Sequence, residues 1–313
     1  MLGSAASLGA AQVVRALSLP EQLNAPSPQR EAALEALRQR NAFLDFLFYD
    51  VGAVSPAEAA CIAPRWAAEG AILLVPPSGS DQLQLCLSVE DFVKAGGSGV
   101  SALVVAGVGS SALGSAAFAR NVADAIGRPV AAVVSGYGLA DLATEALGGF
   151  FWFGYLNQAR HVFERLDRAT EPKMVDEPAT IGASGSTLVR SSRDTRTVLA
   201  LLEDDRLSFD LLSGHSKGNL VISEALYALM RGSPGRARAL AASSTIVTVS
   251  ARIAMPKTFE RVVDVMGGWD WFGGLNSRLD IEAEHVVAQA WHHTNTELPA
   301  HLPVTRALRR ALG

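Results

Sequence analysis

The sequence predicts an α/β protein with a mostly parallel central sheet and helices on both faces of that sheet. Three observations support this fold class. Short apolar runs without charges, such as residues 100–106 and 129–135, are typical of strands that are buried on both faces. Stretches of helical length lie between these runs, and strands that alternate with helices usually build parallel sheets. Hydrophobic residues make up 49% of the 313 residues and charged residues only 19%, so the chain can form a large core.

The N-terminal part, residues 1–82, is expected to form a helical extension that packs on the core. Within it, residues 28–48 are predicted to be helical. Ser27 and Pro28 suit the N-cap and the first helical position, and an apolar stripe follows. The first basic residue is Arg15, and no clear continuous apolar region precedes it. The N-terminus therefore lacks the pattern of a secretory signal.

Residues 83–313 are expected to form the main domain. The expected strands are short apolar or β-branched runs, at residues 83–93, 100–106, 129–135, 207–212, 244–250, 261–266 and 284–290. The expected helices lie at residues 115–126, 187–204, 219–231 and 303–312. Residues 95–119 are 25 residues without a charge, long enough to span a bilayer, but eleven of them are glycine or serine. A buried strand, a glycine-rich turn and a small-residue helix explain this run better than a transmembrane segment.

Residues 139–185 interrupt the alternation of strands and helices before the strand at 207–212. They contain the aromatic run 150–153 and Tyr155, and a polar, proline-containing stretch follows. We expect a helical, lid-like insertion in the main domain. Two interpretations of its aromatic residues stay open: they line an acyl pocket, or they pack as ordinary core against the N-terminal helix.

The segment Gly214-His215-Ser216-Lys217-Gly218 has the G-x-S-x-G pattern of a nucleophile elbow, in which a serine sits on a sharp turn between a strand and a helix. An apolar run precedes the pattern and a helix-like run follows it. Because the serine backbone is strained in such a turn, its neighbours two residues away must be small. The helix N-terminus also brings backbone N–H groups and the positive end of the helix dipole to the hydroxyl. Ser216 is therefore the candidate nucleophile.

A serine hydroxyl needs a histidine base and an acid that orients this base. In this architecture the chain order is serine, acid, histidine. Asp270 follows the strand at 261–266 through two glycines, so its side chain can reach the edge of the sheet. His292 follows an apolar run, where a last strand gives way to a loop. We predict Asp270 as the acid and His292 as the base.

The sequence offers alternative residues for both roles. Asp264 and Asp280 are alternative acids, and Asp270 itself could merely cap a turn. His293 and His285 are alternative bases.

Two adjacent histidines could also suggest a metal site. However, neighbouring residues do not easily face one ion, and no second ligand cluster lies near in sequence, so we expect no metal.

The oxyanion hole needs two backbone N–H groups, one from the residue after the nucleophile and one from the loop after an earlier central strand. Lys217 and Val108 are the candidates. Residues 107–112 also match the G-x-G-x-x-A variant of a dinucleotide fingerprint. A carboxylate for the ribose is expected about 20 residues later, and the next strand ends in Ser135-Gly136-Tyr137 without one. We therefore expect neither NAD nor another cofactor.

Together, these residues resemble the α/β-hydrolase superfamily in its esterase and lipase branch. The resemblance covers residues 83–313. It rests on the loop at 106–111, the elbow at 214–218, the G-x-x-D segment at 267–270 and His292. It implies an acyl-enzyme mechanism without a cofactor. One departure is Ala106-Gly107, where many members of the superfamily have His-Gly at the end of the oxyanion strand.

The predicted function is that of a serine hydrolase that cleaves carboxylic esters of apolar, lipid-like acyl groups. Thioester cleavage, acyl transfer and the degradation of an intracellular polyester would use the same residues and stay open. A hydrolase-fold binding protein without turnover also stays open. The net charge of −4 gives no reason to expect a nucleic-acid partner. The chain has only two cysteines, Cys61 and Cys86, which suggests a reducing compartment, and we expect a cytoplasmic protein. Nothing in the sequence indicates the oligomeric state.

Overall fold

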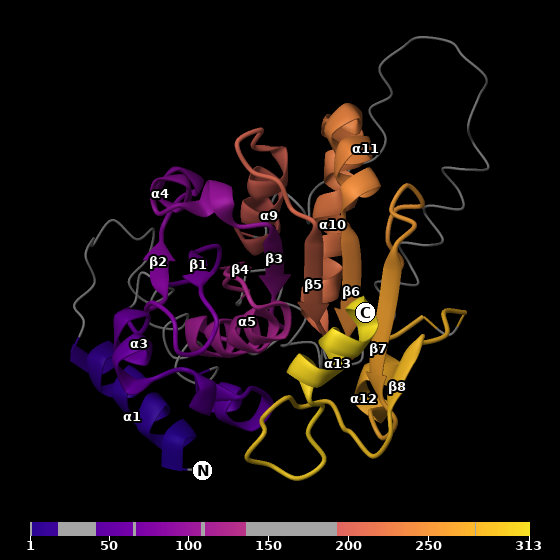
Figure 1. Ribbon diagram of the computed structural model, residues 1–313. Coiled ribbons are helices and arrows are strands. Elements are labelled where there is room, and N and C mark those ends of the chain that lie inside the picture. The colour runs from indigo at the N-terminus through magenta and orange to yellow at the C-terminus, as the bar shows by residue number, and fades with distance from the viewer. Residues whose placement is uncertain (1, 18–41, 65–66, 108–109, 136–192, 279) are drawn as a thin grey trace, which may run out of the picture.

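The computed structural model describes residues 2–17, 42–64, 67–107, 110–135, 193–278 and 280–313 (Figure 1). These residues form an α/β fold around one sheet. The insertion predicted at 139–185 lies outside the described residues, and so does Val108. The first part of the helix predicted at 187–204 also lies outside them.

The described residues build an eight-stranded sheet in the order β2-β1-β4-β3-β5-β6-β7-β8 (Figure 1). Its strands are β1 (Ile72–Val75), β2 (Gln84–Cys86), β3 (Ala102–Val105), β4 (Val130–Val133), β5 (Leu211–His215), β6 (Thr245–Val249), β7 (Val262–Gly267) and β8 (His285–Val287). β1 runs antiparallel to both of its neighbours, β2 and β4, and every other pair is parallel. The sheet is therefore mostly parallel, as predicted.

Helices cover both faces of the sheet. Alternate residues of each strand point to opposite faces, and the apolar residues on each face pack against helices. In β3, Ala102 and Val104 belong to one hydrophobic cluster, whereas Leu103 and Val105 belong to another. The first cluster includes residues of α1 (Leu2–Leu17), α3 (Pro56–Cys61), α5 (Ala112–Ile126) and α13 (Val304–Leu312). The second includes residues of α4 (Val89–Lys94), α9 (Arg193–Glu203), α10 (Lys217–Gly232) and α11 (Pro234–Ser243). The predicted double cover is confirmed.

The direction of the chain connections reverses between β3 and β5. β4 lies on one side of β3 and β5 on the other, and Val105 and Gly214 are register partners at their carboxyl ends. In open parallel sheets, ligands bind at such a switch point, outside the carboxyl ends of the strands. Gly107 follows β3 and Ser216 follows β5, so both lie at this point.

The start of the sheet differs from the sequence predictions. The strand expected at residues 83–93 ends at Cys86 and gives way to α4, because the Ser88 hydroxyl accepts the N–H of Asp91 (3.0 Å) and caps a helix there. β1 precedes residue 83, so the sheet begins within the segment expected to be a helical extension. The expected boundary between residues 82 and 83 falls inside the β1–β2 pair.

The other expected strands are present, although β8 is shorter than expected. Of the helices in the described ranges, none combines the length and apolar character that a membrane crossing needs. The described part of residues 95–119 instead contains η2 (Gly97–Gly99), β3 and the first half of α5. Cys61 and Cys86 are both free thiols.

Candidate active site

Ser216 lies on the sharp turn between β5 and α10. Its backbone has φ 52° and ψ −119°, a conformation that residues with a side chain rarely adopt and that tends to occur at functional sites. A Cβ atom at Gly218 would collide with the carbonyl oxygen of Val105, and one at Gly214 would collide with Asn219. Glycine at 218 therefore lets the turn lie directly against the end of β3, and glycine at 214 leaves room for the first turn of α10.

The side chains of Ser216, His292 and Asp270 form one buried, hydrogen-bonded chain. The Nε2 atom of His292 lies 3.1 Å from Oγ of Ser216. The Nδ1 atom of the same ring lies 2.9 and 3.0 Å from the two carboxylate oxygens of Asp270. A carboxylate can only accept, so Nδ1 carries the proton of the neutral ring and Nε2 accepts the serine O–H. This arrangement allows the ring to remove the hydroxyl proton.

The loops after β7 and β8 bring the acid and the base together. The N–H of Trp269 donates to the carbonyl of Ala290 (2.9 Å), which holds one loop against the other. Asp270 also begins the short helix α12 (Trp271–Leu275), where its carboxylate accepts the N–H of Gly273 (2.6 Å). Asp270 therefore caps a turn and contacts His292 at the same time, and the cap fixes the orientation of its carboxylate.

The alternative acids lie elsewhere. Asp264 is buried in β7, where it accepts a hydrogen bond from the hydroxyl of Thr248. Burial raises the pKa of Asp264 to about 6. Asp280 accepts a hydrogen bond from Nε of Arg278 (2.7 Å) and is mostly exposed.

The alternative bases have other contacts. The Nε2–H group of His293 donates to the carbonyl of Pro299 (3.0 Å), and His285 lies in the edge strand β8. Among the described histidines, His292 is the one whose ring reaches the hydroxyl of Ser216. The structure therefore brings together Ser216, Asp270 and His292, and it does not bring His293 or His285 to the serine.

A cavity of about 380 Å³ opens at Ser216. Its volume lies within the range of small-molecule sites. Its walls come largely from apolar side chains of residues 42–48, α10, α12 and the segment after β6: Leu44, Leu47, Phe48, Leu220, Ile253 and Phe272. The rings of Phe272 and Phe48 also stand edge-on to the His292 ring, with centroids 4.7 and 6.3 Å away. The described part of the site thus offers an apolar space directly beside the serine.

The two residues predicted for the oxyanion hole have different outcomes. Lys217 is the first residue of α10, so its backbone belongs to the helix N-terminus that begins at the serine. Val108 lies outside the described residues. Gly107, at the start of the same loop, donates its N–H to the hydroxyl of Tyr49 (2.7 Å).

Sequence reasoning missed three buried polar residues beside the site, Asp45, Tyr49 and His215. Burial raises the pKa of Asp45 to about 7, although hydrogen bonds from Ser111 and Gly114 act against this shift. The pKa of Tyr49 is raised, mainly by burial. The only sequence signal was the i, i+4 spacing of Asp45 and Tyr49 in an otherwise apolar, helix-like run.

His215 gives a prediction for stability. Burial, followed by the neighbouring His292, lowers the pKa of His215 to about 3, whereas an unfolded chain has a histidine pKa of about 6.5. Below pH 6.5 the unfolded state therefore binds a proton that the folded state does not. The contribution of His215 to stability is complete above pH 6.5 and falls as the pH falls towards 3.

Urea unfolding between pH 7 and pH 4 tests this prediction. The free energy of unfolding of His215→Gln should fall less steeply with decreasing pH than that of the wild type. The difference is at most about 1.4 kcal/mol for each pH unit. Equal slopes in the two proteins would show that His215 takes up its proton as readily in the folded state as in the unfolded state.

Within the described ranges, no group of three or more His, Cys, Asp or Glu side chains is arranged to hold a metal ion. No protein-family model, no curated protein and no solved structure matches the chain. Function is therefore inferred from the geometry of this chain.

Proposed function

We propose that this protein is a serine hydrolase that cleaves carboxylic esters of apolar acyl groups through an acyl-enzyme. The observation that carries the proposal is the chain from Ser216 through His292 to Asp270, which begins on a strained strand-to-helix turn. Strain at a buried serine has a structural cost of about 1–3 kcal/mol, and such strain persists chiefly where function requires it. The strand order and the position of the elbow at the switch point support the α/β-hydrolase fold.

The proposed reaction has two halves. Oγ of Ser216 attacks the carbonyl carbon of the ester while Nε2 of His292 takes the hydroxyl proton, and Asp270 stabilises the imidazolium that forms. The tetrahedral intermediate collapses, the alcohol leaves with the proton from His292, and an acyl-serine remains. A water molecule then gives a proton to His292 and attacks the acyl carbon. As the bond to Oγ of Ser216 breaks, His292 returns the proton to Oγ, which releases the carboxylic acid and restores the serine.

Negative charge develops on the carbonyl oxygen in both halves of the reaction. The backbone N–H of Lys217, at the N-terminus of α10, is our first proposed donor to this oxygen. The backbone N–H of Val108 is the second. In comparable sites, removal of one such donor lowers kcat by about 10²–10³-fold.

The apolar walls of the cavity support an apolar acyl group as the substrate part next to Ser216. Residues 139–185 are proposed as a lid over this site. The two free thiols fit a reducing compartment, and we propose the cytoplasm.

Hydrolysis of p-nitrophenyl acetate, butyrate, octanoate and palmitate by the purified protein tests the function. We expect hydrolysis, with a higher kcat/KM for octanoate than for acetate, because a longer chain buries more apolar surface in the cavity. Acyl-CoA substrates assayed in parallel distinguish a thioesterase, and added alcohols reveal acyl transfer. A folded protein that turns over none of these substrates would contradict the proposal and favour a binding protein.

A further inference from the structure

We propose that Tyr49 and His215 are positioning residues, which fix the backbone of the catalytic histidine relative to the start of the oxyanion loop. This inference rests on the proposed function. Neither residue forms or breaks a bond in the proposed reaction. The evidence is a series of hydrogen bonds that runs from Gly107 to His292. The N–H of Gly107 lies 2.7 Å from the hydroxyl oxygen of Tyr49, and this hydroxyl lies 3.1 Å from Nδ1 of His215. Nε2 of His215 lies 3.0 Å from the carbonyl oxygen of His292.

Only one arrangement of protons fits this chain. A backbone carbonyl can only accept, so Nε2 of His215 carries the proton and donates to His292. In a neutral ring, Nδ1 then accepts, and the hydroxyl of Tyr49 donates to it. The tyrosine oxygen is left to accept the N–H of Gly107. The lowered pKa of His215 agrees with a neutral ring.

The ends of this chain are parts of the catalytic machinery. Gly107 follows β3 and begins the loop that contains Val108. His215 directly precedes the nucleophile, and the carbonyl that it holds belongs to the base, His292. Both middle residues of the chain are only 1% exposed, so water does not compete for these hydrogen bonds.

The same N-terminal segment is fixed at further points. One turn before Tyr49, the carboxylate of Asp45 accepts the backbone N–H groups of Ser111 (3.0 Å) and Gly114 (2.9 Å). Asp45 therefore holds the far end of the oxyanion loop, at the start of α5. On the other side, the N–H of Thr294 donates to the carbonyl of Phe48 (2.7 Å). Residues 45–49 thus connect the oxyanion loop with the segment that follows His292.

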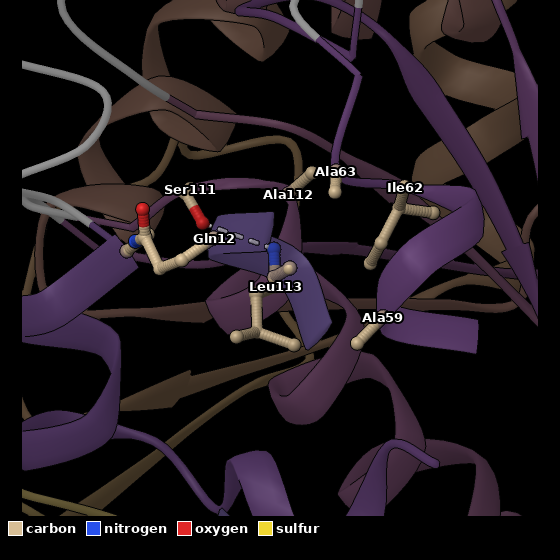
Figure 2. A pocket seen from close by; sticks show the side chains of 9 residues that line it. Gln12, Ala59, Ile62, Ala63, Ser111, Ala112 and Leu113 are labelled. Atoms are coloured by element: carbon tan, nitrogen blue, oxygen red, sulfur yellow. Dashed lines mark hydrogen bonds between the residues drawn. The ribbon is translucent and has the colours of Figure 1, made fainter. Parts of the chain in front are cut away.

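Side chains of the N-terminal elements also pack beside Ser111. Figure 2 shows the N–H of Leu113 donating to the hydroxyl of Ser111, beside Gln12 of α1, with Ile62 on the opposite side of the cavity. The cavity among these side chains has a volume of about 10 Å³, at the lower limit of what a water molecule needs. Side chains of α1 and α3 therefore lie against the start of α5 around this small cavity.

Loss of the Tyr49 hydroxyl would leave the N–H of Gly107 and Nδ1 of His215 buried without partners. Such groups are costly, so the loop and the ring would move to find other partners. A displacement of about 1 Å in a catalytic group can cost about 10² in rate. Because the apolar cavity walls stay in place, substrate binding should change much less than the chemical step.

The test begins with Tyr49→Phe, assayed on p-nitrophenyl butyrate. We expect kcat to fall about 10–100-fold and KM to change less than about threefold. Tyr227→Phe is the matched control, since the hydroxyl of Tyr227 lies 3.5 Å from the carbonyl of Met255, outside this chain. The control should keep kcat within about twofold of the wild type. A wild-type kcat in Tyr49→Phe would overturn the proposal.

Variants of His215 separate positioning from general support of the fold. His215→Gln can still donate to the carbonyl of His292, whereas His215→Leu cannot, so His215→Gln should retain at least about tenfold more activity. If these hydrogen bonds act as a unit, the double variant with Tyr49→Phe and His215→Leu should lose about as much kcat as His215→Leu alone. Independent structural effects add in free energy, so their fold-losses in kcat multiply. A loss in the double variant equal to the product of the two single losses would therefore overturn the proposal.

Nitrogen NMR of the histidine rings distinguishes failure of this inference from failure of the proposed function, since it needs no turnover. We expect His215 to remain neutral, with its proton on Nε2, from pH 7 to pH 4. Tyr49→Phe should shift the ring signals of both His215 and His292, and Tyr227→Phe should shift neither. Unchanged His292 signals in Tyr49→Phe would contradict the positioning role even if the protein hydrolyses no ester.

Discussion

Replacing Ser216 with alanine should lower kcat for p-nitrophenyl butyrate by about 10⁴-fold or more. In the proposed mechanism the variant lacks the atom that forms the acyl-enzyme, and the residues of such a triad act as a unit. KM should change little, because the cavity walls that we propose as the acyl site remain. The fold should remain as well, because alanine keeps the Cβ atom and leaves the backbone conformation of the elbow as it is, so we expect little change in stability.

Ser223→Ala is the matched control for this experiment. Ser223 lies on the same helix, and its hydroxyl donates to the carbonyl of Ala254 (2.8 Å) and not to a residue of the candidate triad. This variant should keep kcat within about twofold of the wild type. Ser216→Ala protein with wild-type activity would remove Ser216 from the mechanism.

Replacing Asp270 with asparagine should lower kcat by about 10⁴-fold, although the two side chains have nearly the same shape. An amide can present an N–H group to Nδ1 of His292, which favours the tautomer with its proton on Nε2. That tautomer cannot accept the hydroxyl proton of Ser216. The amide oxygen can still accept the N–H of Gly273, so α12 and the local fold should be preserved.

Asp264→Asn serves as the comparison for Asp270→Asn. Asp264 is another buried acid, in β7, but its carboxylate accepts the hydroxyl of Thr248 and does not reach the site. Its replacement should affect stability more than kcat. If Asp264→Asn abolished hydrolysis while Asp270→Asn did not, the acid would have been assigned to the wrong residue.

The residues of the candidate triad could be predicted because each one carries a local signal. The elbow needs glycines two residues before and after Ser216, since neighbouring backbone and side chains leave no space for a Cβ. Asp270 and His292 follow apolar strand-like runs, and the ends of parallel strands meet at one edge. These constraints act over a few residues, so they are visible in the sequence alone.

The N-terminal part could not be predicted in the same way. Tyr49 contacts Gly107 and His215 across 58 and 166 residues, and no local pattern encodes such pairings. The strand β1 was missed because four apolar residues cannot be told from a short buried turn or helix by periodicity. α4 was read as a strand because its helix signal is a single cap, Ser88, within an alternating run.

Reaction with a fluorophosphonate is the most direct test of the central claim, that a hydroxyl at the end of β5 is an activated nucleophile. Intact-protein mass spectrometry followed by peptide mapping should find one phosphonyl group, attached to Ser216, with loss of fluoride. Ser216→Ala should remain unlabelled, and Asp270→Asn should react much more slowly than the wild type. A folded wild-type protein that stays unmodified, or that carries the phosphonyl group on another residue, would contradict the account.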